Sequence, residues 1–202
     1  KPRLKGKAFL VRYADDFVIG FEYEEDARRV METVPKRFSK YGLAVHPEKT
    51  RLIPFRKPAT KPGLNSGSTK PGTFDLLGFT HYWGRSWRGN WTVKRKTAAN
   101  RFSRAIKRIG DWMRTHCHWS VGEQHQILGQ KLMGHYAYYG ITGNAERLAA
   151  FRDAVQRLWR KWLGRRNRLG PMNWSRFHEF LTRYSLPRVR VVHSMMGLAA
   201  KP

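Results

Sequence analysis

The chain has 202 residues, of which 40 are Lys or Arg and 14 are Asp or Glu, and its formal net charge is +26. With 41% hydrophobic residues it can build a core, but it has no apolar run of the roughly 20 residues that would span a bilayer. This composition excludes a membrane-spanning helix and favours nucleic acid as partner, because cations neutralise phosphates and aromatic rings stack on unpaired bases. We expect no membrane partner and a cytoplasmic location.

Cys117 is the single cysteine, which excludes an intrachain disulfide and a Cys-x-x-Cys zinc pair. Its neighbours His116 and His118 lack metal-ligand spacing, because three consecutive residues cannot all face one ion. The sequence starts at Lys1, and a predicted strand begins within a few residues of it. We therefore interpret the chain as a piece of a longer protein.

The first predicted element is a β-hairpin over residues 9–21, FLVRYADDFVIGF, whose two apolar runs flank Asp15 and Asp16. A tight turn at residues 14–17 would pair the runs antiparallel and place both carboxylates where the backbone reverses. Adjacent carboxylates repel each other unless a cation lies between them, and hard oxygen ligands suit Mg²⁺. Asp is also a common turn residue, so a solvated Asp-Asp turn is the alternative.

A helix is predicted over residues 22–41, where apolar residues recur every three or four positions, at Ala27, Val30, Met31, Val34 and Phe38. We expect Pro35 to kink this helix and Gly42 to end it. Two short extended segments, residues 43–46 and 51–55, should follow around a turn at residues 47–50.

Residues 56–72, rich in Pro, Gly, Ser and Lys, form a predicted flexible basic loop. A second hairpin is predicted from strands at residues 74–83 and 90–94, joined by a turn rich in Gly, Arg and Trp. From Thr97 onward the apolar period changes from two to about 3.6, which predicts an all-α part.

Three helices are predicted in this part. A shorter fourth should carry Trp174, Phe177, Leu181 and Tyr184 and be ended by Pro187. The first carries an apolar stripe at Phe102, Ile106, Ile109 and Met113. Ser120 and Glu123 predict a capping box at the start of the second, which Gly140 should end, and Asn144 can cap the third.

Three motifs occur in a fixed order: Tyr-Ala-Asp-Asp at 13–16, Gly-Leu-Ala-Val-His-Pro-Glu-Lys-Thr at 42–50, and Phe-Asp-Leu-Leu-Gly-Phe at 74–79. Together they resemble the palm of a reverse transcriptase. More narrowly, the chain resembles a group II intron reverse transcriptase/maturase, because LMGHYAYYG at 132–140 and LWRKWLGRRN at 158–167 are similar to the maturase (X) domain, the thumb of that family.

The resemblance covers about residues 5–194 and implies an α+β fold. A partial right-hand polymerase palm, made of antiparallel hairpins plus a helix and including the primer grip, would span residues 1–95. An all-α thumb of three to four helices would span residues 96–202. The implied protein is a retroelement's RNA-directed DNA polymerase, a nucleotidyltransferase that uses Mg²⁺, dNTPs and an RNA template/DNA primer duplex, and that assists RNA splicing by binding group II intron RNA.

The resemblance also assigns site residues. Asp15 and Asp16 would be catalytic and would bind Mg²⁺, and Lys49 would neutralise the pyrophosphate leaving group, unless it is an ordinary solvated turn lysine. The residues implied in primer binding are Tyr13, Leu77, Gly78 and Phe79. A core strand with a bulge is the alternative for the last three.

In the thumb, a dense basic ridge is predicted to bind RNA through phosphates, and its members are Arg157, Arg160, Lys161, Arg165, Arg166 and Arg168. The aromatic residues between these cations have helical spacing and are more typical of a core than of a base platform.

One departure from the family pattern concerns the third metal-binding aspartate, for which no candidate precedes Tyr13. We therefore expect that this chain alone does not synthesise DNA. Two alternatives stay open: a non-enzymatic, maturase-like splicing cofactor that binds RNA, and a general basic RNA chaperone with an accidental acidic turn. The family's endonuclease module would need paired cysteines after the thumb, and none are present in this sequence. The intron RNA bound and the oligomeric state cannot be predicted from these residues.

Overall fold

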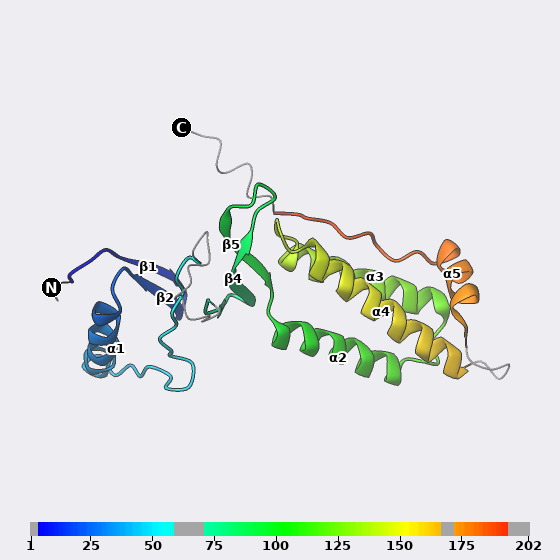
Figure 1. Ribbon diagram of the computed structural model, residues 1–202. Helices are drawn as coiled ribbons and strands as arrows, with labels where there is room; N and C mark the ends of the chain where they lie inside the picture. Colours follow the sequence, from blue (N-terminus) through cyan, green and yellow to red (C-terminus); the bar gives the residue numbers. More distant parts are fainter. Residues whose placement is uncertain (1–3, 59–70, 167–171, 194–202) are drawn as a thin grey trace. The chain divides into compact units, whose positions relative to one another are not determined.

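The computed structural model describes residues 4–58, 71–166 and 172–193 (Figure 1). In these ranges the fold is α+β, with two small antiparallel sheets and five helices. The chain divides into two compact units, Lys1–Lys94 and Arg95–Pro202, which we describe separately. None of the described helices is both long and apolar enough to cross a membrane.

The predicted first hairpin is confirmed. Strand β1 (Ala8–Tyr13) pairs antiparallel with β2 (Asp16–Phe21), and Tyr13 lies opposite Asp16. The two-residue turn is therefore Ala14-Asp15, one residue earlier than expected, and Asp16 is the first residue of β2 rather than a turn residue. Ala14 has a positive φ of 51°, a conformation that L-residues other than Asn and Asp seldom adopt.

Helix α1 (Glu24–Ser39) follows and is two residues shorter at each end than predicted. It continues past Pro35 for a further turn before it ends. Gly42, with φ of 68°, ends it as expected: the Leu43 amide donates to the Phe38 carbonyl (3.0 Å) and the Gly42 amide to the Ser39 carbonyl (3.1 Å). These are the two hydrogen bonds of a Schellman motif.

The predicted extended segments at residues 43–46 and 51–55 do not form strands, and this expectation was wrong. Short apolar segments become strands only where a neighbouring strand completes their hydrogen bonds, and the described residues provide none here. The turn between them is present, because the Thr50 amide and hydroxyl both donate to the His46 carbonyl, at 3.1 and 2.9 Å.

The second predicted hairpin has a different arrangement from the expected one. The single strand expected at residues 74–83 is two strands, β3 (Phe74–Leu76) and β4 (Phe79–Arg85), which pair antiparallel. Leu77 and Gly78 have φ of 51° and 78° and form the two-residue turn between them, because positive φ at both positions reverses a hairpin. Strand β5 (Trp91–Thr97) completes a sheet with the order β3-β4-β5.

In the second unit the helical prediction is confirmed by α2 (Ala99–Thr115), α3 (Val121–Tyr139), α4 (Ala145–Arg166) and α5 (Trp174–Arg183). Helices α2, α3 and α4 run alongside one another (Figure 1). The capping box of Ser120 and Glu123 is present at the start of α3. Twelve buried residues form the core: Ile109, Met113, Leu128, Leu132, Tyr136, Leu148, Phe151, Val155, Trp159, Leu163, Phe177 and Leu186.

Gly140 ends α3, as predicted, and is also a contact point for the carboxyl-terminal segment of the unit. The amides of Val192 and His193 donate to the Gly140 carbonyl at 2.7 and 2.8 Å. A Cβ on Gly140 would lie 2.8 Å from the Arg190 carbonyl oxygen, so a larger residue would displace this backbone. Only glycine combines the helix end with this close backbone approach.

Candidate catalytic hairpin and nucleic-acid interface

The turn of the β1–β2 hairpin presents two carboxylates to solvent. Asp15 occupies the second turn position, Asp16 begins β2, and both side chains are exposed. Neither carboxylate makes a hydrogen bond or ion pair with the described residues, although the chain carries 40 Lys and Arg. The nearby Arg12 uses its Nε to donate to the Ala14 carbonyl (2.8 Å), which supports the turn and leaves the carboxylates available.

The start of this hairpin is anchored to α1 by Asp26, which is 1% exposed. Its Oδ2 accepts hydrogen bonds from the amides of Lys5 (2.9 Å) and Gly6 (3.0 Å). The Gly6 hydrogen bond is the main cause of the lowered pKa of this carboxyl, because amide donors favour its ionised form. Asp26 therefore fixes where the chain enters β1.

The donor set at the turn fits Mg²⁺ in part. This ion is commonly held by one or two carboxylates together with water and substrate phosphates, and Asp15 and Asp16 offer oxygen donors of that kind. In the described part of the chain, no group of three or more His, Cys, Asp or Glu residues comes together. At this turn the described chain thus offers two carboxylates, and water and substrate phosphates are the usual further ligands of Mg²⁺.

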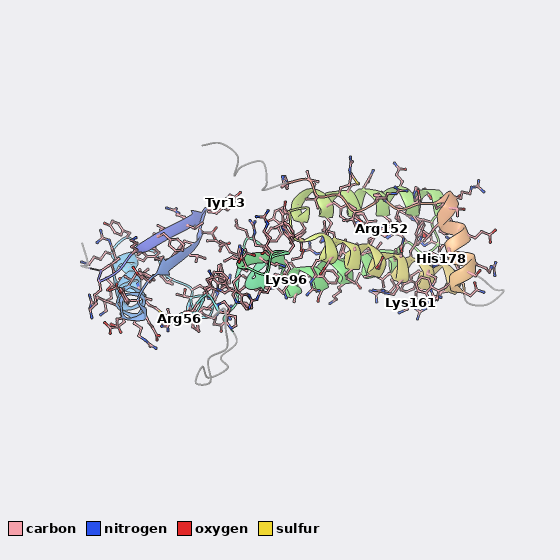
Figure 2. All side chains as sticks on the ribbon, turned by 45° about the horizontal axis from the view of Figure 1, so that its top comes forward. Tyr13, Arg56, Lys96, Arg152, Lys161 and His178 are labelled. Atoms are coloured by element: carbon pink, nitrogen blue, oxygen red, sulfur yellow. The ribbon has the colours of Figure 1, made fainter. Side chains whose placement is uncertain are left out.

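The residues expected to bind the primer lie on the two hairpins of the first unit. Tyr13 ends β1 opposite Asp16 and is exposed (Figure 2). Leu77 and Gly78 form the β3–β4 turn, Phe79 begins β4, and these three residues are half-buried. Because β2 contacts β3, the two hairpins are neighbours within this unit.

Lys49 is exposed in the turn at residues 47–50. Among the described residues it makes no hydrogen bond or ion pair, so the structure does not join it to the carboxylates of the first hairpin.

One comparison with protein families bears on the first unit. Residues 2–81 match the family model for reverse transcriptase (RNA-dependent DNA polymerase). This match contains the paired aspartates, α1, β3 and the beginning of β4. Searches of the curated proteins and of the solved structures gave no match. The reverse transcriptase match indicates a function related to RNA-directed DNA polymerase, a kind of enzyme that uses divalent metal and binds nucleic acid and dNTPs.

The described part of the predicted basic ridge lies on α4, outside the region that matches the reverse transcriptase family. Its residues fall into two groups, exposed cations and cations that donate to a backbone carbonyl. Arg157, Lys161 and Arg165 recur at four-residue intervals and are exposed, so they share one face of the helix (Lys161 is labelled in Figure 2). Arg160 is half-buried, donates to the Met172 carbonyl (2.7 Å) and covers the Trp174 ring at 4.2 Å.

Arg166 donates to the Trp119 carbonyl (2.7 Å), so it too is engaged with the protein. Arg168 lies outside the described residues. Among the described members of the predicted ridge, Arg157, Lys161 and Arg165 are therefore the ones that are exposed and make no such hydrogen bond to a backbone carbonyl.

Sequence reasoning gave no role to the β4–β5 turn, where Trp87 is 89% exposed between Arg85 and Arg88. Two signals could have identified it. One is the combination of Trp and Arg in a predicted turn, and the other is the surrounding stretch between Asp75 and Asp111, which has nine Lys and Arg and no Asp or Glu.

Proposed function

We propose that residues 1–95 form part of the palm of an RNA-directed DNA polymerase and residues 96–202 its thumb. The observation that carries this proposal is the position of Asp15 in the tight turn of an antiparallel hairpin and of Asp16 directly after it, inside the region that matches the reverse transcriptase family. Adjacent carboxylates repel each other, and neither has a cation partner among the described residues, which supports a role for both toward an external cation.

In this proposal Asp15 and Asp16 hold Mg²⁺, which supplies activation of the primer hydroxyl and neutralises the triphosphate when bound. Tyr13, beside the carboxylates on β1, packs against the primer end, and the Leu77-Gly78 turn supports the primer strand. Lys49 neutralises the departing pyrophosphate. Each of these residues lies in the first unit.

Metal binding provides a test that needs no catalytic activity. Mn²⁺, which has a paramagnetic signal, should bind the chain and lose its principal site in the double variant Asp15→Asn/Asp16→Asn. Glu32→Gln, which removes an exposed acid from α1, is the matched control and should bind as the unmodified chain does. Equal Mn²⁺ binding by the double variant and the control would contradict the proposed metal site.

We also propose that the chain alone is inactive in synthesis, because the family uses a third aspartate that these residues do not supply. Primer extension on an RNA template, with Mg²⁺ and dNTPs, should give no product from the isolated chain. Magnesium-dependent extension that disappears in the Asp15→Asn/Asp16→Asn variant would overturn this part of the proposal.

The second unit is proposed to bind group II intron RNA and so to assist splicing, with the exposed face of α4 among the contacts. A non-enzymatic, maturase-like cofactor is the alternative function, favoured by the fact that only two acids gather at the described hairpin turn. Substitution of Asp15 and Asp16 in the complete protein distinguishes the two. If the unmodified protein synthesises DNA and the variant loses synthesis but still binds RNA, the polymerase function is supported. If the unmodified protein shows no synthesis and the variant assists splicing equally well, the cofactor function is supported.

A further inference from the structure

The β4–β5 turn presents Trp87 on a fixed backbone. The Ser86 amide donates to the Asn90 carbonyl (2.7 Å), and the Gly89 amide donates to the Ser86 carbonyl (3.0 Å). The Asn90 amide donates to the Ser86 hydroxyl (3.1 Å), and Gly89 has the φ of 78° that the tight reversal needs. The backbone that carries the exposed Trp87 side chain is thus held by hydrogen bonds within the turn.

One cation lies against this tryptophan, and two more lie in the turn or on its strands. The Arg88 guanidinium lies 4.9 Å from the centre of the Trp87 ring. Arg85 lies 4.2 Å from the Trp91 ring and donates to the Gly89 carbonyl at 2.7 Å, so the turn also fixes its position. The Lys94 side chain lies against Gly84 on the neighbouring strand, next to Arg85.

No carboxylate from the turn or its strands offsets these cations, because the sequence between Asp75 and Asp111 has no Asp or Glu. The local field is therefore positive and favours a phosphate-bearing ligand. A protein partner that recognised Trp87 by burial would have to desolvate the adjacent guanidinium groups, which is costly without matching acids.

We propose that the Trp87 turn is a binding site for unpaired nucleotides. A base stacks on the indole ring, and Arg85, Arg88 and Lys94 contact the flanking phosphates. Stacking needs an exposed base face, which a duplex interior does not offer, so the site selects single strands over duplexes. The inference rests on the proposed nucleic-acid function and adds the location of one contact and the form of the strand that it takes.

The test measures binding of the 202-residue chain to fluorescently labelled oligouridylate and oligothymidylate of about ten nucleotides. An abasic strand of equal length serves as the probe without bases. Trp87→Ala should weaken binding of both base-bearing strands roughly tenfold, and Trp87→Phe should retain most of the affinity, because an aromatic face remains. The unmodified chain should bind the abasic strand about as weakly as Trp87→Ala binds the others.

Tyr41→Ala is the matched control, since Tyr41 is another exposed aromatic residue of the first unit and should not affect binding. Trp87 lies outside the buried core, so thermal unfolding of its variants should coincide with that of the unmodified chain. The inference is overturned if Trp87→Ala binds base-bearing strands normally, or if the abasic strand binds as tightly as they do. Tighter binding of oligouridylate would identify RNA as the preferred single strand, and tighter binding of oligothymidylate would identify DNA. Either preference supports the proposed site.

Failure of this inference can be told apart from failure of the proposed function. If strand binding depends on salt but is unchanged in Trp87→Ala, the nucleotide site at Trp87 is disproved and the polymerase proposal stands. If strand binding depends on Trp87 but Mn²⁺ binding is unchanged in Asp15→Asn/Asp16→Asn, the proposed metal site is disproved and the nucleotide site stands.

Discussion

Asn144 and Thr97, 47 residues apart in the sequence, form a reciprocal pair of buried hydrogen bonds. The Thr97 amide donates to Asn144 Oδ1 (2.9 Å), and Asn144 Nδ2 donates to the Thr97 hydroxyl (2.8 Å) and to the Tyr139 carbonyl (2.8 Å). The amide side chain expected to cap α4 therefore joins the end of β5 to the α3–α4 connection. Both residues are 1% exposed.

Asn144→Ala should destabilise the protein by about 2–3 kcal/mol, because it leaves the buried Thr97 amide without its acceptor. Chemical unfolding measures the change in the free energy of unfolding. Combining it with Thr97→Val should give a coupling energy of at least about 0.5 kcal/mol in a double-mutant cycle. Asn100→Ala, an exposed position on α2, is the control and should change stability by no more than about 0.5 kcal/mol. Strict additivity would disprove the pairing.

Stability should fall between about pH 6.5 and about pH 4 because of His135. Burial lowers the pKa of His135 from 6.5 to about 4, and its ring stacks on Phe151 at 3.7 Å. Above pH 6.5 the ring is neutral in both the folded and the unfolded chain, and the folded state keeps its full stability. Between pH 6.5 and about pH 4 the unfolded chain binds a proton at His135 that the folded chain does not, so the free energy of unfolding falls. The loss should be on the order of 1–3 kcal/mol.

His135→Phe should flatten this part of the pH profile, measured by unfolding at several pH values. His178→Gln, at an exposed position of α5, is the control and should leave the slope unchanged. A slope that survives in His135→Phe would assign the pH dependence to other groups.

The β3–β4 turn should respond in opposite ways to two substitutions. Gly78→Ala should cost about 1 kcal/mol, because alanine disfavours the positive φ of this position. Leu77→Asn should stabilise the hairpin by several tenths of a kcal/mol, since Asn-Gly is a preferred sequence for such turns. Thermal unfolding reports both effects. If Leu77 also supports the primer, Leu77→Asn in the complete polymerase should weaken primer binding while the turn becomes more stable.

The exposed cations of α4 should control the salt dependence of RNA binding. Replacing Arg157, Lys161 and Arg165 with Gln should reduce the slope of log K against log salt by about 2 to 3, if each contacts one phosphate. A matched triple substitution at the end of α1, at Lys36, Arg37 and Lys40, is the control and should alter the slope less. Equal slopes for the two triple variants would argue against RNA contact by α4.

Arg160→Gln should behave differently from these surface variants. It removes the hydrogen bond to the Met172 carbonyl and the cation–π contact with Trp174, so it should lower stability by about 1–2 kcal/mol. Unfolding measurements separate this structural effect from RNA affinity. A fully stable Arg160→Gln protein with impaired RNA binding would contradict it.

Sequence patterns predicted the local features well where one residue type has one dominant use. Gly42 ends α1, and Ser120 with Glu123 begins α3, because the hydrogen bonds involved connect residues only a few positions apart. The apolar periodicity of the second unit likewise identified buried residues such as Tyr136 and Trp159, which are core residues.

The errors arose where distant residues or turn geometry decide the outcome. Asn is a common helix-capping residue, so Asn144 was expected to cap α4. Its hydrogen-bond partner Thr97 is 47 residues away and cannot be predicted from a local pattern. Leu77 adopts a positive φ that leucine rarely takes, so the turn in the expected strand could not be predicted from it. In the candidate site, the sequence predicted the hairpin that carries Asp15, but it placed the turn one residue too late.

The anchoring of Lys5 and Gly6 by Asp26 has a consequence for strand register. A slip of one residue between the strands would exchange the positions of Asp15 and Asp16 relative to the turn and move each side chain of β1 to the opposite face. Since the amide hydrogen bonds to Asp26 hold the amino-terminal end of β1 against a helix that is continuous in sequence with β2, such a slip would break them. A buried carboxylate in α1 thereby selects which of the two adjacent acids occupies the bend.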